Sequence, residues 1–227
     1  MLVYWLLFAF FAFGALITQP TPGPARRDGQ YNAGYPAPFR PFFIAGAIAT
    51  VCLVGLRYEV GGDWGSYLAI FNRIQGETLA TSLKIGDPAY QLLNWIGATL
   101  GAGVWLVNLL SGAIFAWGLY RLCSVQPSPW LAFAVAVPYM VIVVAMGYTR
   151  QSIALGVLMA GLARQSRGGS TLNFALYVAA AACFHKTAAV VYPLVALSGK
   201  GSRFVNLLIA VFASILLYDL FLGDSMN

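Results

Sequence analysis

Long apolar segments separated by short polar stretches run through most of this chain and constrain what it can fold into. They lie at about 1–18, 41–56, 88–101, 104–122, 130–146, 149–163, 171–184, 187–199 and 204–222. Only 9% of the 227 residues are charged, whereas a soluble domain usually has about a quarter. Several segments approach the roughly 20 residues that a helix needs to cross a bilayer. Because the backbone in hydrocarbon must satisfy its own hydrogen bonds, the sequence predicts an all-α polytopic membrane protein with about seven to nine transmembrane or re-entrant helices.

The polar stretches between these segments predict loops, and no segment has the composition of a separate soluble domain. We therefore expect residues 1–227 to form a single integral membrane domain. The Pro- and Gly-rich stretch 18–41 predicts a polar loop. The stretch 57–87 predicts a second loop, which contains an interfacial amphipathic helix because apolar residues recur there at helical spacing: Trp64, Tyr67, Leu68, Phe71 and Ile74. The first apolar segment lacks the basic start and small-residue cleavage pattern of a signal peptide, so we expect it to be retained as a helix.

The charges predict which loops share a side of the membrane. If 88–101 is a re-entrant or interfacial helix, one side receives Arg26, Arg27, Arg40, Arg121, Arg164, Arg167, Lys200 and Arg203, with Asp28 as its one acid. Every other acid falls on the opposite side. Positively charged loops are usually cytoplasmic, so 18–41 is expected inside the cell and 57–87 outside it. A full crossing by 88–101 would remove this charge bias, and about 14 residues are short for a crossing.

The same reasoning divides 171–199 into two short helices that turn at His185 and Lys186. A single span would bury both residues at the centre of the membrane and place the two flanking basic loops on opposite sides. Two short helices place both loops inside, and the turn then lies in a recess on the outer side, where polar groups in membrane proteins are tolerated.

The stretch "RYEVGGDWGSY" (57–67) carries the first group of candidate functional residues. Asp63 precedes the amphipathic helix, so it is either the N-cap of that helix or a catalytic base, and the two roles are compatible. Arg57 and Glu59 either flank the membrane or bind substrate. Further along, Asp87 is expected to cap the helix that Pro88 begins.

The stretch "GYTRQS" (147–152) places Arg150 in the first turn of a helix, after Gly147 breaks the preceding one. A cation there opposes the helix dipole. A bound anion would resolve the conflict, because helix N-termini bind phosphate and a guanidinium holds it through two hydrogen bonds. The alternative is an arginine that pairs with Asp63 or Glu59, or that extends to the membrane interface.

The stretch "CFHKTAAVVYPL" (183–194) contains the one histidine of the chain, His185, followed by Lys186. Ionisable groups at a turn among apolar helices indicate a functional site. One histidine and three scattered cysteines provide no zinc ligand set, so no metal site is expected. We find no P-loop or dinucleotide motif, and expect neither a cofactor nor a nucleic-acid partner.

Taken in order, four stretches resemble the EpsG family of bacterial exopolysaccharide membrane proteins, which is grouped with Wzy-type polysaccharide polymerases. They are the 57–67 stretch, "DPAYQLLNWI" (87–96), "GYTRQSIALGV" (147–157) and "FHKTAAVVYPL" (184–194), and the resemblance covers roughly residues 40–200. It implies a glycosyl transfer at the outer face of the plasma membrane, in which a glycan on undecaprenyl diphosphate passes to a hydroxyl of another lipid-linked repeat unit. Members of the family are usually longer, so we expect this chain to be a fragment or a short variant.

The resemblance also implies roles for residues in the matching stretches. Arg150 is expected to hold the diphosphate, with Lys186 and Arg57 in support, and Asp63 or His185 to accept the proton of the attacking hydroxyl. The remaining substrate contacts are expected from Glu59, Tyr67, Tyr148 and Gln151. Expected partners are membrane lipid, the lipid-linked oligosaccharide and other polysaccharide assembly proteins. The alternatives are a flippase for lipid-linked oligosaccharides and a non-catalytic subunit of an assembly complex.

Overall fold

The computed structural model describes residues 1–18 and 39–197, together with residues 204, 208, 211 and 215. Within this part of the chain all regular elements are helices, so the predicted all-α fold is confirmed. Most of the predicted loop 18–41 and of the last apolar segment, 204–222, lies outside the described residues.

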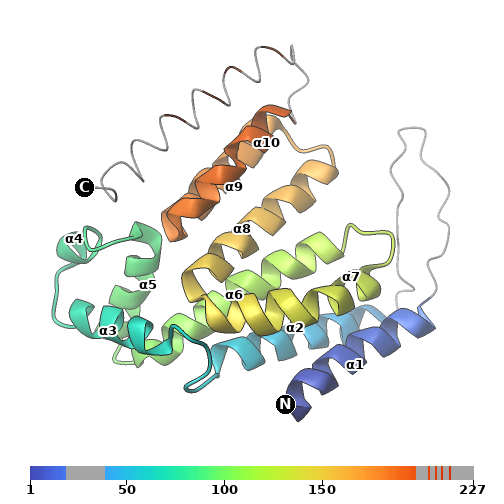
Figure 1. The fold of residues 1–227 in the computed structure, drawn as a ribbon, viewed down its shortest axis with the longest axis horizontal. Coiled ribbons are helices and arrows are strands. Elements are labelled where there is room, and N and C mark those ends of the chain that lie inside the picture. Colours follow the sequence, from blue (N-terminus) through green and yellow to red (C-terminus); the bar gives the residue numbers. More distant parts are fainter. Residues whose placement is uncertain (19–38, 198–203, 205–207, 209–210, 212–214, 216–227) are drawn as a thin grey trace.

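The fold consists of a bundle of long helices with a group of shorter helices at one end (Figure 1). The bundle contains α1 (Leu2–Ile17), α2 (Arg40–Gly55), α6 (Gly103–Cys123), α7 (Pro129–Ala136) with its π-helical continuation η2 (Val137–Ala145), α8 (Thr149–Ser166) and α9 (Thr171–Phe184). The shorter helices at the end are α3 (Trp64–Ile74), α4 (Leu79–Ser82) and α5 (Pro88–Thr99). A 3₁₀ helix, η3 (Lys186–Val191), and α10 (Tyr192–Leu197) follow α9.

The two ends of the bundle differ in charge. At the end that we call the basic end, α6 and α8 finish with Arg121 and Arg164 in their last turns, and α2 begins with Arg40. The opposite end, which we call the site end, carries α3, α4 and α5 (Figure 1). All four acidic residues in the described part of the chain are there, within the 57–87 stretch. Because α5 stays at the site end and does not run along the bundle, Arg121 and Arg164 lie at the same end, as the charge pattern predicted.

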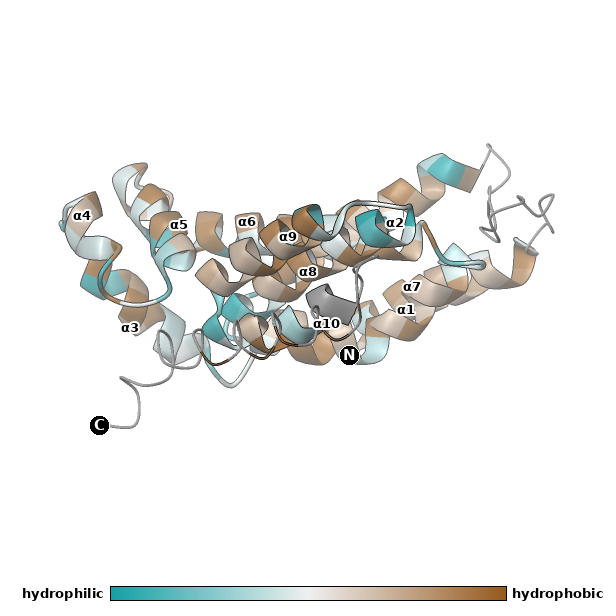
Figure 2. Cartoon of the chain, turned by 90° about the horizontal axis from the view of Figure 1, so that it is seen from above, coloured by the Kyte–Doolittle hydropathy of each residue, from teal (hydrophilic) through white to brown (hydrophobic). Residues whose placement is uncertain are grey.

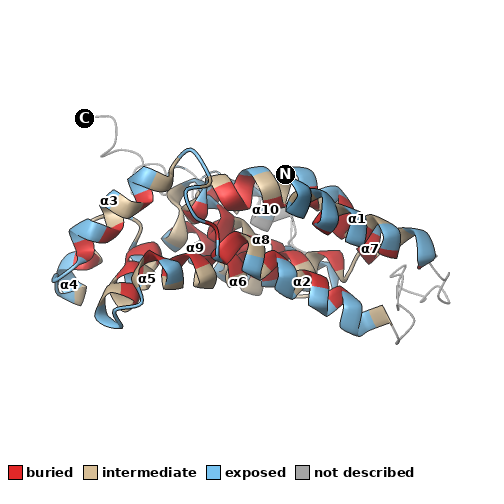
Figure 3. Ribbon diagram, turned by 90° about the horizontal axis from the view of Figure 1, so that it is seen from below, coloured by how far each residue is buried: buried red, intermediate tan, exposed pale blue. Residues whose placement is uncertain are grey.

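The outer faces of several bundle helices are both apolar and exposed. Figures 2 and 3 show this surface on α1 and α2, and on α7. Its large side chains include Trp5, Phe13, Phe42, Ile48, Leu131 and Val135. Among the described helices, α6 alone combines the length and hydropathy of a complete membrane span; Leu2–Ile17, Arg40–Gly55, Pro129–Ala145 and Thr171–Phe184 are shorter apolar helices. A continuous apolar exterior of this kind is expected of a protein surrounded by lipid.

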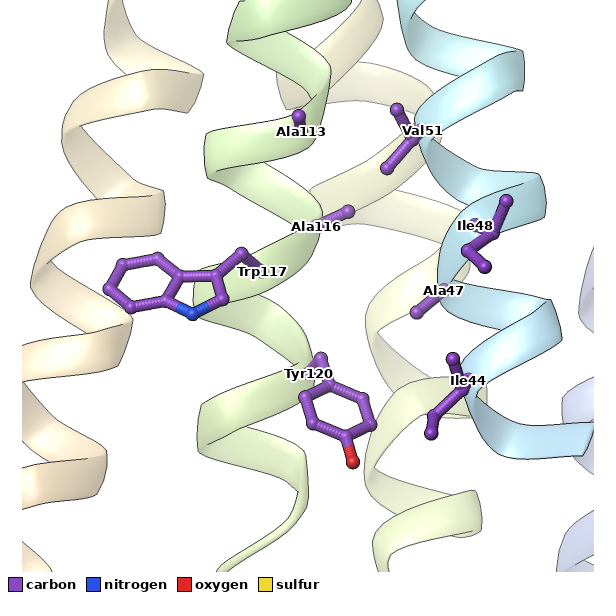
Figure 4. Close-up of a pocket in the computed structure, with 8 residues that line it drawn as sticks. All are labelled: Ile44, Ala47, Ile48, Val51, Ala113, Ala116, Trp117 and Tyr120. Atoms are coloured by element: carbon purple, nitrogen blue, oxygen red, sulfur yellow. The ribbon is translucent and has the colours of Figure 1, made fainter. Parts of the chain in front are cut away.

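A shallow groove of about 320 Å³ lies between α2 and α6 (Figure 4). Its walls are almost entirely apolar: Ile44, Ala47, Ile48, Val51, Ala113, Ala116, Trp117 and Tyr120. None of these residues is charged, so the groove provides packing surface and no catalytic group.

Close backbone contact holds α6 against α8 at the centre of the bundle. Gly118 of α6 faces Gly156 of α8, and a Cβ atom at Gly118 would overlap the carbonyl group of Gly156. In the reverse direction, a Cβ atom at Gly156 would lie 2.6 Å from the carbonyl oxygen of Ile114. Small residues allow membrane helices to approach this closely and to gain dispersion energy from the contact.

We expect Gly118→Ala to destabilise the fold, because the new methyl group would meet backbone atoms of Gly156, which cannot rotate away, and would force α6 and α8 apart. Overpacking of this kind costs about 1–3 kcal/mol. Thermal unfolding of the purified protein in detergent should show the loss as a lower midpoint temperature. Gly65→Ala is the matched control, since a Cβ atom there meets open space in α3. Equal midpoints for the two variants would contradict the close crossing.

Candidate functional site

The charged group that holds Arg150 is Asp87. A guanidinium nitrogen of Arg150 donates a hydrogen bond to Asp87 Oδ2 at 3.0 Å, joining the first turn of α8 to the residue before α5. The side chain of Asp87 is 10% exposed and that of Arg150 is 37% exposed. Pro88 begins α5 as predicted, but the Asp87 side chain makes no capping hydrogen bond. Asp87 therefore occupies the predicted N-cap position, with its side chain turned to Arg150 instead of to the helix. The alternative pairing of Arg150 with Asp63 or Glu59 is wrong.

The same carboxylate oxygen also faces His185. His185 Nδ1 lies 3.9 Å from Asp87 Oδ2, which is within ion-pair range and too long for a hydrogen bond. His185 adopts an extended conformation between the end of α9 and η3, which confirms the predicted break at His185 and Lys186. Burial opposes the ionisation of Asp87, but His185 and Arg150 outweigh it, so the pKa of this carboxyl is below its ordinary value. Asp87 is thus the shared anion of a three-residue cluster.

Arg57 reaches inward to the point where η2 gives way to α8. It is 5% exposed, donates a hydrogen bond to the carbonyl oxygen of Ala145 at 2.6 Å and donates a second to the Thr149 hydroxyl. Burial lowers the pKa of its guanidinium, against the opposing effect of Tyr67 and Tyr90. The end of a helix leaves carbonyl oxygens without partners, and Arg57 satisfies one of them. Arg57 therefore fixes the segment that begins at Thr149 and carries Arg150.

A glycine contact fixes the Arg57 loop against the same break. Gly61 has a φ of +101°, and a Cβ atom there would overlap the carbonyl oxygen of Met146. Only glycine adopts this conformation without strain and leaves room for the neighbouring backbone. The loop and the start of α8 are thus held together by Gly61 as well as by Arg57.

Two tyrosines complete the surroundings of the cluster. Tyr67 of α3 interacts with the Arg150 guanidinium, and its ring lies 5.9 Å from that of Tyr90 in α5. Among the described residues, the buried Tyr90 hydroxyl meets no partner at hydrogen-bond geometry, and neither do Arg57 Nε, Arg150 Nε and His185 Nδ1. Both tyrosines thus lie beside the two arginines Arg57 and Arg150 and form the buried side of the cluster.

The other predicted site residues lie at the site end without joining this cluster. Asp63 occupies the N-cap position of α3, as predicted, but its side chain makes no capping hydrogen bond. It is half-buried, and the described part of the chain shows no ion pair for it. Glu59, Tyr148 and Gln151 are exposed. Lys186 is half-buried directly after His185.

The sequence reasoning missed Asp87 and Tyr90 as site residues. Both lie in the "DPAY" stretch, which was interpreted as a helix start. One signal was available: an acid at the start of a segment predicted to remain at the outer face, where the predicted cations also gather. Charge balance alone favoured an acid near Arg150, but three other acids in the 57–87 stretch, Glu59, Asp63 and Glu77, were equally available.

Comparison with known proteins gives one match. A family model described as "EpsG family" matches residues 41–224, a range that includes all the residues of the cluster. No curated protein and no solved structure matches the chain significantly.

Proposed function

The chain belongs to the EpsG family, which is associated with exopolysaccharide biosynthesis, and from this premise we propose that it is a polysaccharide polymerase-like glycosyltransferase. It crosses the bacterial plasma membrane several times, with about seven to nine transmembrane or re-entrant helices and the site end outside the cell. There it joins repeat units carried on undecaprenyl diphosphate. The observation that carries this proposal is the ion pair between Arg150 and Asp87, with His185 facing the same carboxylate.

The reaction requires a cation where negative charge develops. The oxygen of the acceptor hydroxyl forms a bond to the anomeric carbon of the donor glycan, and the bond from that carbon to the diphosphate oxygen breaks. The electron pair leaves with undecaprenyl diphosphate. Arg150, whose side chain is partly exposed beside Asp87, stabilises this leaving group more strongly than the intact donor. Lys186 supplies a second positive charge, and Arg57 holds the start of α8 in place.

The acceptor hydroxyl must lose its proton as it attacks, and His185 is the base that the geometry favours. A carboxylate facing one ring nitrogen orients an imidazole and stabilises the imidazolium that forms when the other nitrogen accepts a proton. Asp87 Oδ2 lies 3.9 Å from Nδ1 of His185, close enough for its charge to stabilise the imidazolium. Before substrate binds, Asp87 neutralises the charge of Arg150. The diphosphate then replaces Asp87 as the anion that pairs with Arg150. Asp63 remains the second candidate for the base.

The test is an elongation assay with the purified protein in proteoliposomes and a lipid-linked repeat unit prepared from the source strain. A ladder of longer lipid-linked glycans, with release of undecaprenyl diphosphate, is the expected result. Movement of the lipid-linked unit across the bilayer without elongation would establish the flippase instead. A protein inactive alone, which only increases elongation by a partner protein, would be the non-catalytic subunit.

A further inference from the structure

Three aromatic side chains from three different elements meet at the site end. Tyr58 comes from the loop after α2, Trp64 begins α3 and Trp105 lies in the first turn of α6. The rings of Tyr58 and Trp105 are stacked, with centroids 6.0 Å apart and planes 14° from parallel. Trp64 meets both edge-on, at 6.0 Å from Tyr58 and 6.4 Å from Trp105. We call these three residues the aromatic platform.

The platform is exposed, unlike the other large aromatic cluster of the protein. Tyr58 is 63% exposed and Trp105 is 42% exposed, and Trp64 is half-buried. By contrast, Phe11 and Phe133, whose rings stack at 3.9 Å, are fully buried in the bundle. Burial in the core therefore does not account for the arrangement of the platform, whose rings hold one another in place while part of their surface remains free.

Acidic side chains flank the platform on the same loop. Glu59 follows Tyr58 and is exposed, and Asp63 precedes Trp64 and is half-buried. Glu59 has a φ of +51°, a conformation that is uncommon for a residue with a side chain. The loop is anchored between them by the contact of Gly61 with Met146. The loop that carries Tyr58 and both carboxylates is thus held by its own backbone contact beside the two tryptophans of α3 and α6.

We propose that the aromatic platform binds a sugar ring of the glycan, with its C–H groups against an aromatic face and its hydroxyls donating to Glu59 and Asp63. The electron-rich face of an aromatic ring attracts the weakly positive C–H face of a pyranose, and ionised carboxylates accept strong hydrogen bonds from hydroxyls. Placement supports the proposal: Tyr58 follows Arg57, the residue that fixes the start of α8, and adjacent Cα atoms are about 3.8 Å apart. The identification of the ligand as a glycan rests on the proposed function.

The competing explanation is that the three rings anchor the protein in the membrane interface, where Trp and Tyr are common. Two carboxylates beside the rings are unsuited to contact with anionic lipid headgroups, and three rings packed against one another present less surface to lipid than separate ones. These features favour the sugar as the occupant. The experiment below separates the two explanations.

The test measures binding of a glycan that carries no lipid and requires no catalysis. Oligosaccharides of one to three repeat units, released by mild acid from the exopolysaccharide of the source strain and labelled at the reducing end, are titrated with the purified full-length protein. Fluorescence polarisation gives the dissociation constant. We expect Tyr58→Ala and Trp105→Ala each to weaken binding about tenfold, and Tyr58→Phe to remain within about twofold of the wild type. Trp5→Ala is the matched control, because Trp5 is an exposed indole on α1, away from the platform.

The outcomes decide between the readings. Unchanged glycan binding in Tyr58→Ala and Trp105→Ala, or an equal loss of binding in Trp5→Ala, would contradict the proposal that the platform binds a sugar ring. If those two variants bind the glycan normally but are extracted from membranes by alkaline carbonate more easily than the wild type, the platform is an interfacial anchor. A wild-type protein that elongates lipid-linked units without binding the free glycan would refute the platform and leave the polymerase standing. If the wild type binds the free glycan through the platform but does not elongate lipid-linked units, the platform stands and the proposed polymerase activity is refuted.

Discussion

Replacing Arg150 with alanine is expected to lower the rate of glycan elongation about 30- to 1000-fold, because a charge-assisted contact to the leaving group is worth about 2–4 kcal/mol in the transition state. The side chain is partly exposed, so the variant should still fold and insert. Arg150→Lys should lose most of the activity as well, since an ammonium lacks the planar pair of donors that holds a diphosphate. Initial rates of elongation at equal amounts of folded protein measure the effect.

Arg73→Ala is the matched control for this loss, because Arg73 is an exposed arginine near the end of α3 at the same end of the bundle. The structural alternative is that Arg150 only neutralises Asp87. In that case Arg150→Ala should reduce the yield of folded protein, since an unpaired, largely buried carboxylate is costly, and Asp87→Asn should restore it. A double variant Arg150→Ala/Asp87→Asn that makes normal amounts of polymer would disprove the role of Arg150 in leaving-group stabilisation.

We expect His185→Gln to reduce elongation about 100- to 10,000-fold, the range typical of a lost general base. The glutamine retains a polar side chain of similar size at the turn between α9 and η3, so the fold should be preserved. The pH dependence of kcat/KM is the decisive measurement. If His185 is the base, the residual activity of the variant should have a different pH profile from that of the wild type.

Asp63→Asn provides the comparison for His185. If Asp63→Asn loses as much activity as expected of His185→Gln, and His185→Gln keeps the wild-type pH profile, then Asp63 is the base and His185 has a structural role. Asp87→Asn should behave differently from both, because Asp87 positions His185 and pairs with Arg150 at once. It should lower activity and, by removing the anion that orients the ring, also change the pH profile.

Much of the helical organisation was available from the sequence, because local patterns determine helices. Apolar segments predicted α2, α6, α8 and α9 to within a few residues. The spacing of apolar residues predicted α3, and the structure buries Tyr67, Phe71 and Ile74 of its apolar face. The breaks that carry Arg150 and His185 were also predicted. Glycine weakens a helix and charged residues interrupt an apolar segment, so both breaks can be recognised from the residues next to them.

The partners of the site residues were decided only by the tertiary structure. Arg150 pairs with an acid 63 positions away, and nothing in the sequence near either residue distinguishes Asp87 from Asp63 or Glu59 as that acid. The choice follows from how α5 returns beside the starts of α6 and α8 and the end of α9. The same packing directs Arg57 inward to Ala145 and Thr149, whereas the sequence left open whether it flanks the membrane or binds substrate. A helix pattern specifies which residues share a face, whereas an ion pair between helices depends on their relative position, which the packing of the whole bundle sets.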